Sequence, residues 1–199
     1  DWAEPIDLPD EELASQYPVV VLFLDECNSG APSVMAAAYQ LVLNRKVGNY
    51  HLPENVVIVA AGNRESDKGV TYRMPTPLAN RFTHFEMKVD FDSWLDWAAH
   101  NRVHKDVVGY VSFAKNDLYD FDPKSSSRAF ATPRSWTFAS NLLKEGADDR
   151  TTKHLIAGAI GDGLAIKFMA HRKIASQMPN PTEILEGKVK ELKVKEISA

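Results

Sequence analysis

The chain has 199 residues, of which 44% are hydrophobic, and it carries a net charge of −4 at pH 7. This is enough chain to bury one good core, or one core and a smaller appendage, whereas the acidic balance argues against a broad nucleic-acid-binding surface. A single cysteine excludes an internal disulfide, no apolar run approaches the ~18 residues that span a bilayer, and the first residues are acidic where a signal peptide is basic, so we expect a soluble cytoplasmic protein without membrane contact.

The first informative stretch is residues 19–26, with the sequence VVVLFLDE. Six consecutive apolar residues followed by two acids are typical of a strand that is buried on both faces of a parallel sheet. Asp25 and Glu26 then lie at the carboxyl end of the strand, where open α/β sheets bind their ligands. Two adjacent acids there suit a magnesium phosphate, one holding metal-bound water and the other polarising a nucleophilic water. The alternative is a strand that merely ends in solvated acids.

A helix and a hairpin follow this strand. Pro32 begins a helix whose apolar residues at positions 34, 38, 41 and 42 fall on one face, which predicts packing against the sheet. Gly48 and Asn49, between two short β-type pairs, indicate a two-residue hairpin. We interpret this hairpin as a connector, with a partner contact in a ring assembly as the alternative.

Residues 56–61, VVIVAA, predict a second buried strand that ends at Gly62 and Asn63. An asparagine beside an acid-tipped strand can hydrogen-bond an attacking water or a terminal phosphate oxygen, although asparagine is also a common turn residue. Further on, a short helix delivers Arg81 near its end. A guanidinium suits a phosphoryl transition state, with an ordinary surface arginine as the alternative. The alternation of residues 83–89 predicts a third strand.

From residue 90 onward the pattern is helical. It predicts a helix over 91–101 capped by Asp92, a short helix over 107–113 and a helical stretch over 151–178. Thr132 and Pro133 suit the N-cap and first position of another helix, which places Arg134 in its first turn beside free backbone amides. Such a helix start with an arginine favours an anion site, and the alternative is an exposed arginine next to a cap.

The order of these features resembles the AAA+ ATPases, and within them the MoxR-like branch of bacteria and phages. LFLDE with the following Asn28 resembles the Walker B strand, and VIVAAGN resembles the sensor 1 strand. TYRMPTPLANRF resembles the stretch that ends in the arginine finger, and Arg134 resembles the sensor 2 arginine of the helical lid. The resemblance covers residues 19–134, which is more than half of the chain.

The resemblance implies an α/β fold with a partial P-loop-NTPase-like parallel sheet and an all-α lid. The sheet is expected to hold the Walker B strand, the sensor 1 strand and the strand after them. The implied domains are the second part of a nucleotide-binding domain at residues 1–89, the lid at 90–178 and a charged helical tail at 179–199. The implied function is ATP binding and hydrolysis with Mg²⁺ by a cytoplasmic, ring-forming homo-oligomer that remodels a protein partner.

The resemblance also implies a role for each candidate residue. Asp25 binds Mg²⁺ through water, Glu26 activates the attacking water, and Asn63 orients that water against the γ-phosphate. Arg81 reaches into the site of a neighbouring subunit, and Arg134 couples the nucleotide state to the position of the lid.

One motif of the family does not occur in the sequence. No GxxxxGK[ST] P-loop is present, although this loop precedes Walker B in the family and supplies most of the grip on the triphosphate. Because the chain begins with Asp1 and not Met, we expect either a longer protein that supplies the P-loop, or strand exchange in a dimer that satisfies the open sheet edges. The rival hypothesis is a non-enzymatic assembly or adaptor piece that has lost nucleotide turnover, and a nucleic-acid motor is disfavoured by the acidic charge.

Overall fold

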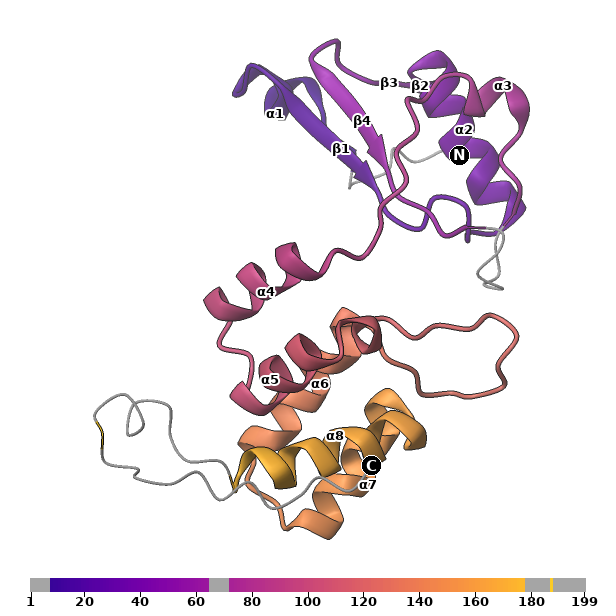
Figure 1. Ribbon diagram of the computed structural model, residues 1–199. Helices are drawn as coiled ribbons and strands as arrows, with labels where there is room; N and C mark the ends of the chain where they lie inside the picture. The colour runs from indigo at the N-terminus through magenta and orange to yellow at the C-terminus, as the bar shows by residue number, and fades with distance from the viewer. Residues whose placement is uncertain (1–7, 65–71, 178–186, 188–199) are drawn as a thin grey trace. The chain divides into compact units, whose positions relative to one another are not determined.

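The computed structural model describes residues 8–64, 72–177 and 187. The chain divides into two compact units, residues 1–86 and residues 87–199 (Figure 1). The first unit combines strands with helices and the second is built from helices, so the fold is mixed α/β.

A two-stranded parallel sheet forms the centre of the first unit. Strand β1 (Val20–Leu24) pairs with β4 (Val56–Ala60) in a register that aligns Val20 with Val56 and Leu24 with Ala60. Both strands are rich in β-branched residues, which favour the extended backbone. The connection between them contains helix α2 (Pro32–Asn44), as expected for parallel strands that need a crossover.

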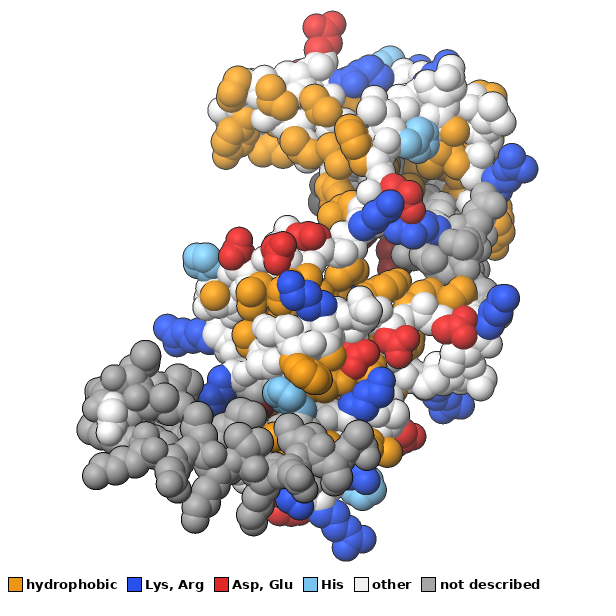
Figure 2. Space-filling view, in the orientation of Figure 1, with side chains coloured by type: hydrophobic (Ala, Val, Ile, Leu, Met, Phe, Trp, Pro, Cys, Tyr) orange, Lys and Arg blue, Asp and Glu red, His pale blue; other side chains and the backbone are white. Residues whose placement is uncertain are grey.

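One face of this sheet is covered and the other is bare. On the covered face a small core forms around Leu41 of α2 and Val56 of β4, joined by Tyr50, Leu52 and partly buried Val20, Leu22 and Ile58. The side chains of Val21 and Phe23 point to the opposite face and are more than half exposed. Figure 2 shows hydrophobic side chains gathered over this part of the first unit. The prediction that the strand at 19–26 is buried on both faces is therefore wrong for this chain, because none of the described elements packs on the second face.

The short elements around the sheet follow local sequence signals. Helix α1 (Glu11–Ser15) begins at the N-cap Asp10, whose side chain accepts a hydrogen bond from the Leu13 amide at 2.7 Å. The predicted hairpin is confirmed as β2 (Lys46–Val47) paired with β3 (Tyr50–His51), with Gly48 in the left-handed region at φ 56°. Both elements support the covered face of the sheet, since the Tyr50 hydroxyl donates to the Pro9 carbonyl at 2.6 Å.

The third strand predicted over residues 83–89 does not form. After the short helix α3 (Thr76–Ala79) the chain runs without regular structure to residue 90. Phe85 is 87% exposed, and Arg64 pairs with Glu86 at 3.1 Å across the surface. Alternating side chains are not sufficient for a strand, because the backbone also needs a neighbour to hydrogen-bond, and no described strand lies beside this segment.

The second unit is a cluster of helices around aromatic side chains. Its elements are α4 (Phe91–His100), α5 (Lys105–Phe113), the 3₁₀ helix η2 (Lys115–Leu118), α6 (Pro133–Lys144), α7 (Asp149–Ile160) and α8 (Asp162–Ala175). Trp136 and Phe168 are completely buried, with ring centroids 5.7 Å apart, and Tyr110 packs against both. None of the helices in the described ranges has the length and apolar character needed to cross a bilayer.

Two details of the second unit differ from expectation. Helix α4 is capped by Asp90 and not by Asp92, since the Asp90 side chain accepts from the Ser93 amide at 2.8 Å. The helical stretch over 151–178 is broken at Gly161, whose φ of 92° is costly for any other residue. A Cβ atom at Gly161 would also lie 3.0 Å from the Ala129 carbonyl oxygen, a tight contact that a larger residue could make only if this backbone shifted. The predicted tail helix at 179–199 lies outside the described residues, apart from Gly187.

Candidate functional site

The candidate site lies at the carboxyl edge of the β1–β4 sheet. Asp25 and Glu26 directly follow β1, and Asn63 follows β4 after two residues. The backbone pairing continues past both strands, because the Ala61 amide donates to the Leu24 carbonyl and the Cys27 amide donates to the Ala61 carbonyl, each at 2.9 Å. The structure therefore brings these three predicted site residues to one edge, as expected for parallel strands that end together.

The backbone of Glu26 adopts an unusual conformation within this edge. Its φ of 51° lies in the left-handed region, which costs a non-glycine residue about 1–2 kcal/mol. The Glu26 amide donates to the Asp25 carboxylate at 2.9 Å, which turns the chain sharply after the strand. Both residues are exposed, so each carboxylate can accept a hydrogen bond from water.

These carboxylates fit a hydrated Mg²⁺ better than a metal held only by protein. The described residues contain no group of three or more His, Cys, Asp or Glu side chains placed to hold a metal together. Mg²⁺ in nucleotide sites keeps several waters and takes one or two carboxylates plus substrate phosphates, and Asp25, with Glu26 beside it, could supply the carboxylate. Burial and, to a smaller extent, the charge of Asp25 raise the pKa of the neighbouring Cys27 thiol, so this cysteine is neutral and a poor nucleophile.

Asn28 is the residue of this edge whose role the sequence analysis missed. Its side-chain amide nitrogen donates to the Asn63 carbonyl at 2.7 Å, and its amide oxygen accepts from the Asn63 backbone amide at 3.1 Å. The side chain of Asn28 thus ties the end of β1 to the end of β4. The only signal in the sequence is an amide residue placed shortly after one strand, with a Gly-Asn pair directly after the other.

Arg81 lies just past α3, and its positive charge is not paired with a carboxylate of the described residues. Its guanidinium donates to the Pro77 carbonyl of the preceding turn at 2.9 Å, and it forms no ion pair with any carboxylate of the described ranges. The structure does not join Arg81 to Asp25 or Glu26 of the same chain. An exposed arginine of this kind can bind an anionic group of another molecule.

Arg134 belongs to the second unit, where the predicted helix start is confirmed. Thr132 and Ser135 form a capping box, Pro133 is the first residue of α6, and Arg134 follows with an exposed side chain. Trp136 anchors this turn from below, since its indole nitrogen donates to the Asp117 carbonyl at 2.8 Å. The guanidinium therefore lies at a helix end that is held by these hydrogen bonds. The free backbone amides of this end favour a negatively charged group.

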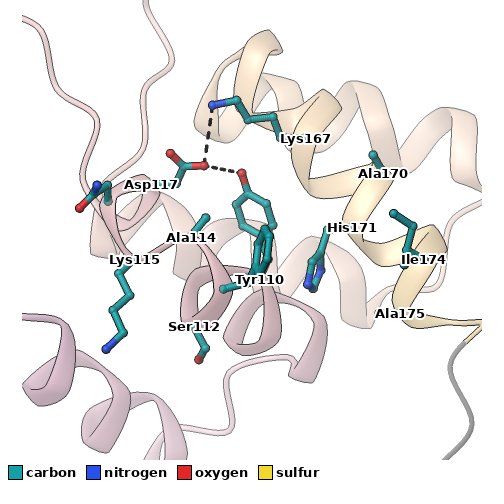
Figure 3. Close-up of a pocket in the computed structure, with 12 residues that line it drawn as sticks. Tyr110, Ser112, Ala114, Lys115, Asp117, Lys167, Ala170, His171, Ile174 and Ala175 are labelled. Carbon is teal, nitrogen blue, oxygen red and sulfur yellow. Dashed lines mark hydrogen bonds and ion pairs between the residues drawn. The ribbon is translucent and has the colours of Figure 1, made fainter. Parts of the chain in front are cut away.

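A separate hollow of about 870 Å³ lies within the second unit, between α5, η2 and α8 (Figure 3). At one end the Tyr110 hydroxyl donates to the Asp117 carboxylate at 2.5 Å, and the Lys167 amine lies 4.0 Å from the same carboxylate. Burial first, and then this carboxylate, raise the pKa of Tyr110, so the phenol stays protonated. None of the predicted site residues lines this hollow.

Compared with protein-family models, with curated proteins and with solved structures, the chain matches none. The assignment of its function therefore depends on the motifs and on the geometry of the sheet edge.

Proposed function

We propose that the chain is the catalytic and sensing part of a MoxR-like AAA+ ATPase, whose nucleotide-binding domain is followed by a helical lid. The single observation that carries the proposal is the shared sheet edge, where an Asp-Glu pair after one parallel strand lies beside an asparagine after the next. In this proposal the edge provides a carboxylate for the metal (Asp25), a general base (Glu26) and a side-chain amide (Asn63). Phosphoryl transfer to water uses these three kinds of group.

Each residue has a defined task in this proposal. Asp25 holds Mg²⁺ through a bound water, Glu26 accepts a proton from the attacking water, and Asn63 orients that water against the γ-phosphate. When bound, Mg²⁺ would neutralise the charge that develops on the phosphate oxygens, and Asp25 is the residue that would hold it. Arg81 stabilises the same charge from a neighbouring subunit of the ring, and Arg134 senses the nucleotide from the lid. Movement of the lid and of the subunits then remodels a protein partner.

The P-loop is assigned to polypeptide outside these 199 residues. Two features of the chain support this assignment. The second face of the sheet carries exposed valines and a phenylalanine, whereas parallel sheets in proteins are covered on both faces. Residues 83–89 alternate as a strand does but have no described strand beside them, and an additional parallel strand would supply that neighbour.

The rival proposal is a nucleotide-inactive assembly or adaptor piece of an AAA+ protein. It is favoured by one observation, the lack of a GxxxxGK[ST] motif in the sequence, because the two carboxylates alone cannot grip a triphosphate. The two proposals differ in one prediction. The natural polypeptide hydrolyses ATP in the first proposal and does not hydrolyse it in the rival proposal.

The test begins with the natural polypeptide, purified from its source. Its intact mass is measured first. ATP binding and hydrolysis are then measured for the wild type, for Glu26→Gln and for the control Glu54→Gln, which changes an exposed glutamate at the opposite end of β4. We expect Glu26→Gln to bind ATP but to lose about 10²–10⁴-fold in kcat, and Glu54→Gln to match the wild type. Unchanged hydrolysis in Glu26→Gln would overturn the catalytic assignment, and a wild type that neither binds nor hydrolyses ATP would establish the adaptor.

A further inference from the structure

The contact between Asn28 and Asn63 is unusual in that one side chain pairs with both backbone groups of a single distant residue. The two hydrogen bonds, at 2.7 and 3.1 Å, join positions 35 residues apart. Because both the carbonyl and the amide of Asn63 are hydrogen-bonded, rotation of its backbone is restrained. The contact uses only the backbone of Asn63. Its side chain can therefore hydrogen-bond a water or a phosphate oxygen.

Asn28 also connects a third segment to the same edge. Its backbone carbonyl accepts a hydrogen bond from the Tyr72 amide at 2.8 Å. Tyr72 lies in the stretch that leads into α3 and Arg81. One residue therefore contacts the segments that carry the acid pair, the asparagine and the arginine of the proposed site.

Gly62 makes this arrangement possible. A Cβ atom at position 62 would lie 2.6 Å from the Asn28 side-chain oxygen and 3.0 Å from its Cγ atom. These distances are too short for an alanine to be accepted without displacing Asn28, whose side chain is short and held at both of its polar atoms. Gly62 is required here for close approach, so Asn28 and Gly62 form a matched pair.

From these contacts we propose that Asn28 is the positioning residue that holds Asn63 in register with Glu26 for ATP hydrolysis. This inference rests on the proposed function. Only asparagine fits the task, because it presents a donor nitrogen and an acceptor oxygen in a single planar group of this length. Aspartate keeps the acceptor for the Asn63 amide but places a carboxylate oxygen against the Asn63 carbonyl, so it retains only half of the contact.

The first experiment measures the contact itself in the 199-residue chain, without nucleotide. Hydrogen exchange of the Asn63 amide is followed by NMR in the wild type, Asn28→Ala, Gly62→Ala and the double variant. We expect exchange to accelerate roughly tenfold in each single variant, because the hydrogen bond to the Asn28 oxygen is lost. Gly62→Ala should add nothing in the Asn28→Ala background, since no side chain remains to be displaced. Unchanged exchange in Asn28→Ala would overturn the inference.

The second experiment introduces the same substitutions into the natural polypeptide and measures kcat and KM for ATP. Asn28→Ala and Gly62→Ala should each lower kcat by about 10²-fold with KM little changed, as expected when a reacting group is misplaced. Asn28→Asp should fall between Asn28→Ala and the wild type. The matched control is Asn55→Ala, which removes another asparagine clamp of the same unit, from its side chain to the Ala14 and Tyr17 carbonyls, and should leave kcat unchanged.

The outcomes separate this inference from the proposed function. Faster exchange at Asn63 with an unchanged kcat would overturn the positioning role and leave the ATPase assignment intact. Equal losses of kcat in Asn28→Ala and Asn55→Ala would also overturn it, because a general loss of stability would then explain both. A wild type without ATP hydrolysis would refute the proposed function, whatever the exchange at Asn63 shows, and the positioning role would fall with it.

Discussion

Two neighbouring valines of β4 provide a direct test of the bare sheet face. Val56 is 1% exposed within the core of the first unit, whereas Val57 is 50% exposed on the opposite face. The same substitution, Val→Thr, exchanges one methyl group for a hydroxyl at each position while keeping the β-branched shape. The two variants therefore differ only in the face of the sheet that they probe.

The expected costs follow from the two environments. In Val56→Thr a hydroxyl is buried among Leu41, Tyr50 and Leu52, which costs about 1–3 kcal/mol of the free energy of unfolding. In Val57→Thr the hydroxyl remains in contact with water, so the change should stay within about 0.5 kcal/mol. If the additional polypeptide proposed above covers this face, the cost of Val57→Thr in its presence should rise to a value like that of Val56→Thr.

Hydrogen exchange of the β1 and β4 amides during urea titration measures these costs for the first unit alone. Sedimentation of each sample establishes whether the chain is a monomer or a dimer under the same conditions. Equal costs for Val56→Thr and Val57→Thr in the monomer would refute the reasoning, because they would mean that both faces are buried within the chain. Equal costs in a dimer would instead identify a second copy as the cover.

Two further predictions concern the second unit. Trp136→Phe keeps an aromatic ring in the core but removes the donor to the Asp117 carbonyl, so the free energy of unfolding should fall by about 1–3 kcal/mol in urea titrations followed by circular dichroism, and no change would contradict the hydrogen bond. Hydrogen bonds from the Thr151 hydroxyl and amide lower the pKa of Asp148, the N-cap of α7, below its ordinary value. The folded state therefore favours the carboxylate, and its stabilising effect is complete above the unfolded pKa of about 3.9 and is lost as the pH falls through the lower folded pKa. Asp148→Asn should show a weaker loss of helical signal over this range, and an acid transition identical to that of the wild type would contradict the role of the cap.

Local signals in the sequence were sufficient for many individual elements. Both sheet strands were predicted as apolar runs, the hairpin was predicted from Gly48 and Asn49, and the start of α6 was predicted from Thr132 and Pro133. Each of these signals acts over a few residues, through backbone preference or a cap. The meeting of Asp25, Glu26 and Asn63 at one edge was also predictable, because parallel strands place their carboxyl ends together.

Other features depended on neighbours that the local pattern does not specify. Residues 83–89 alternate as a strand does, but a strand also needs a backbone partner, and only the tertiary structure shows that none of the described strands supplies one. The bare face of β1 is likewise a property of what packs on it and not of its apolar sequence. For the same reason the sequence placed Asn28 in a motif but did not give its partner, because a contact across 35 residues is decided by the fold.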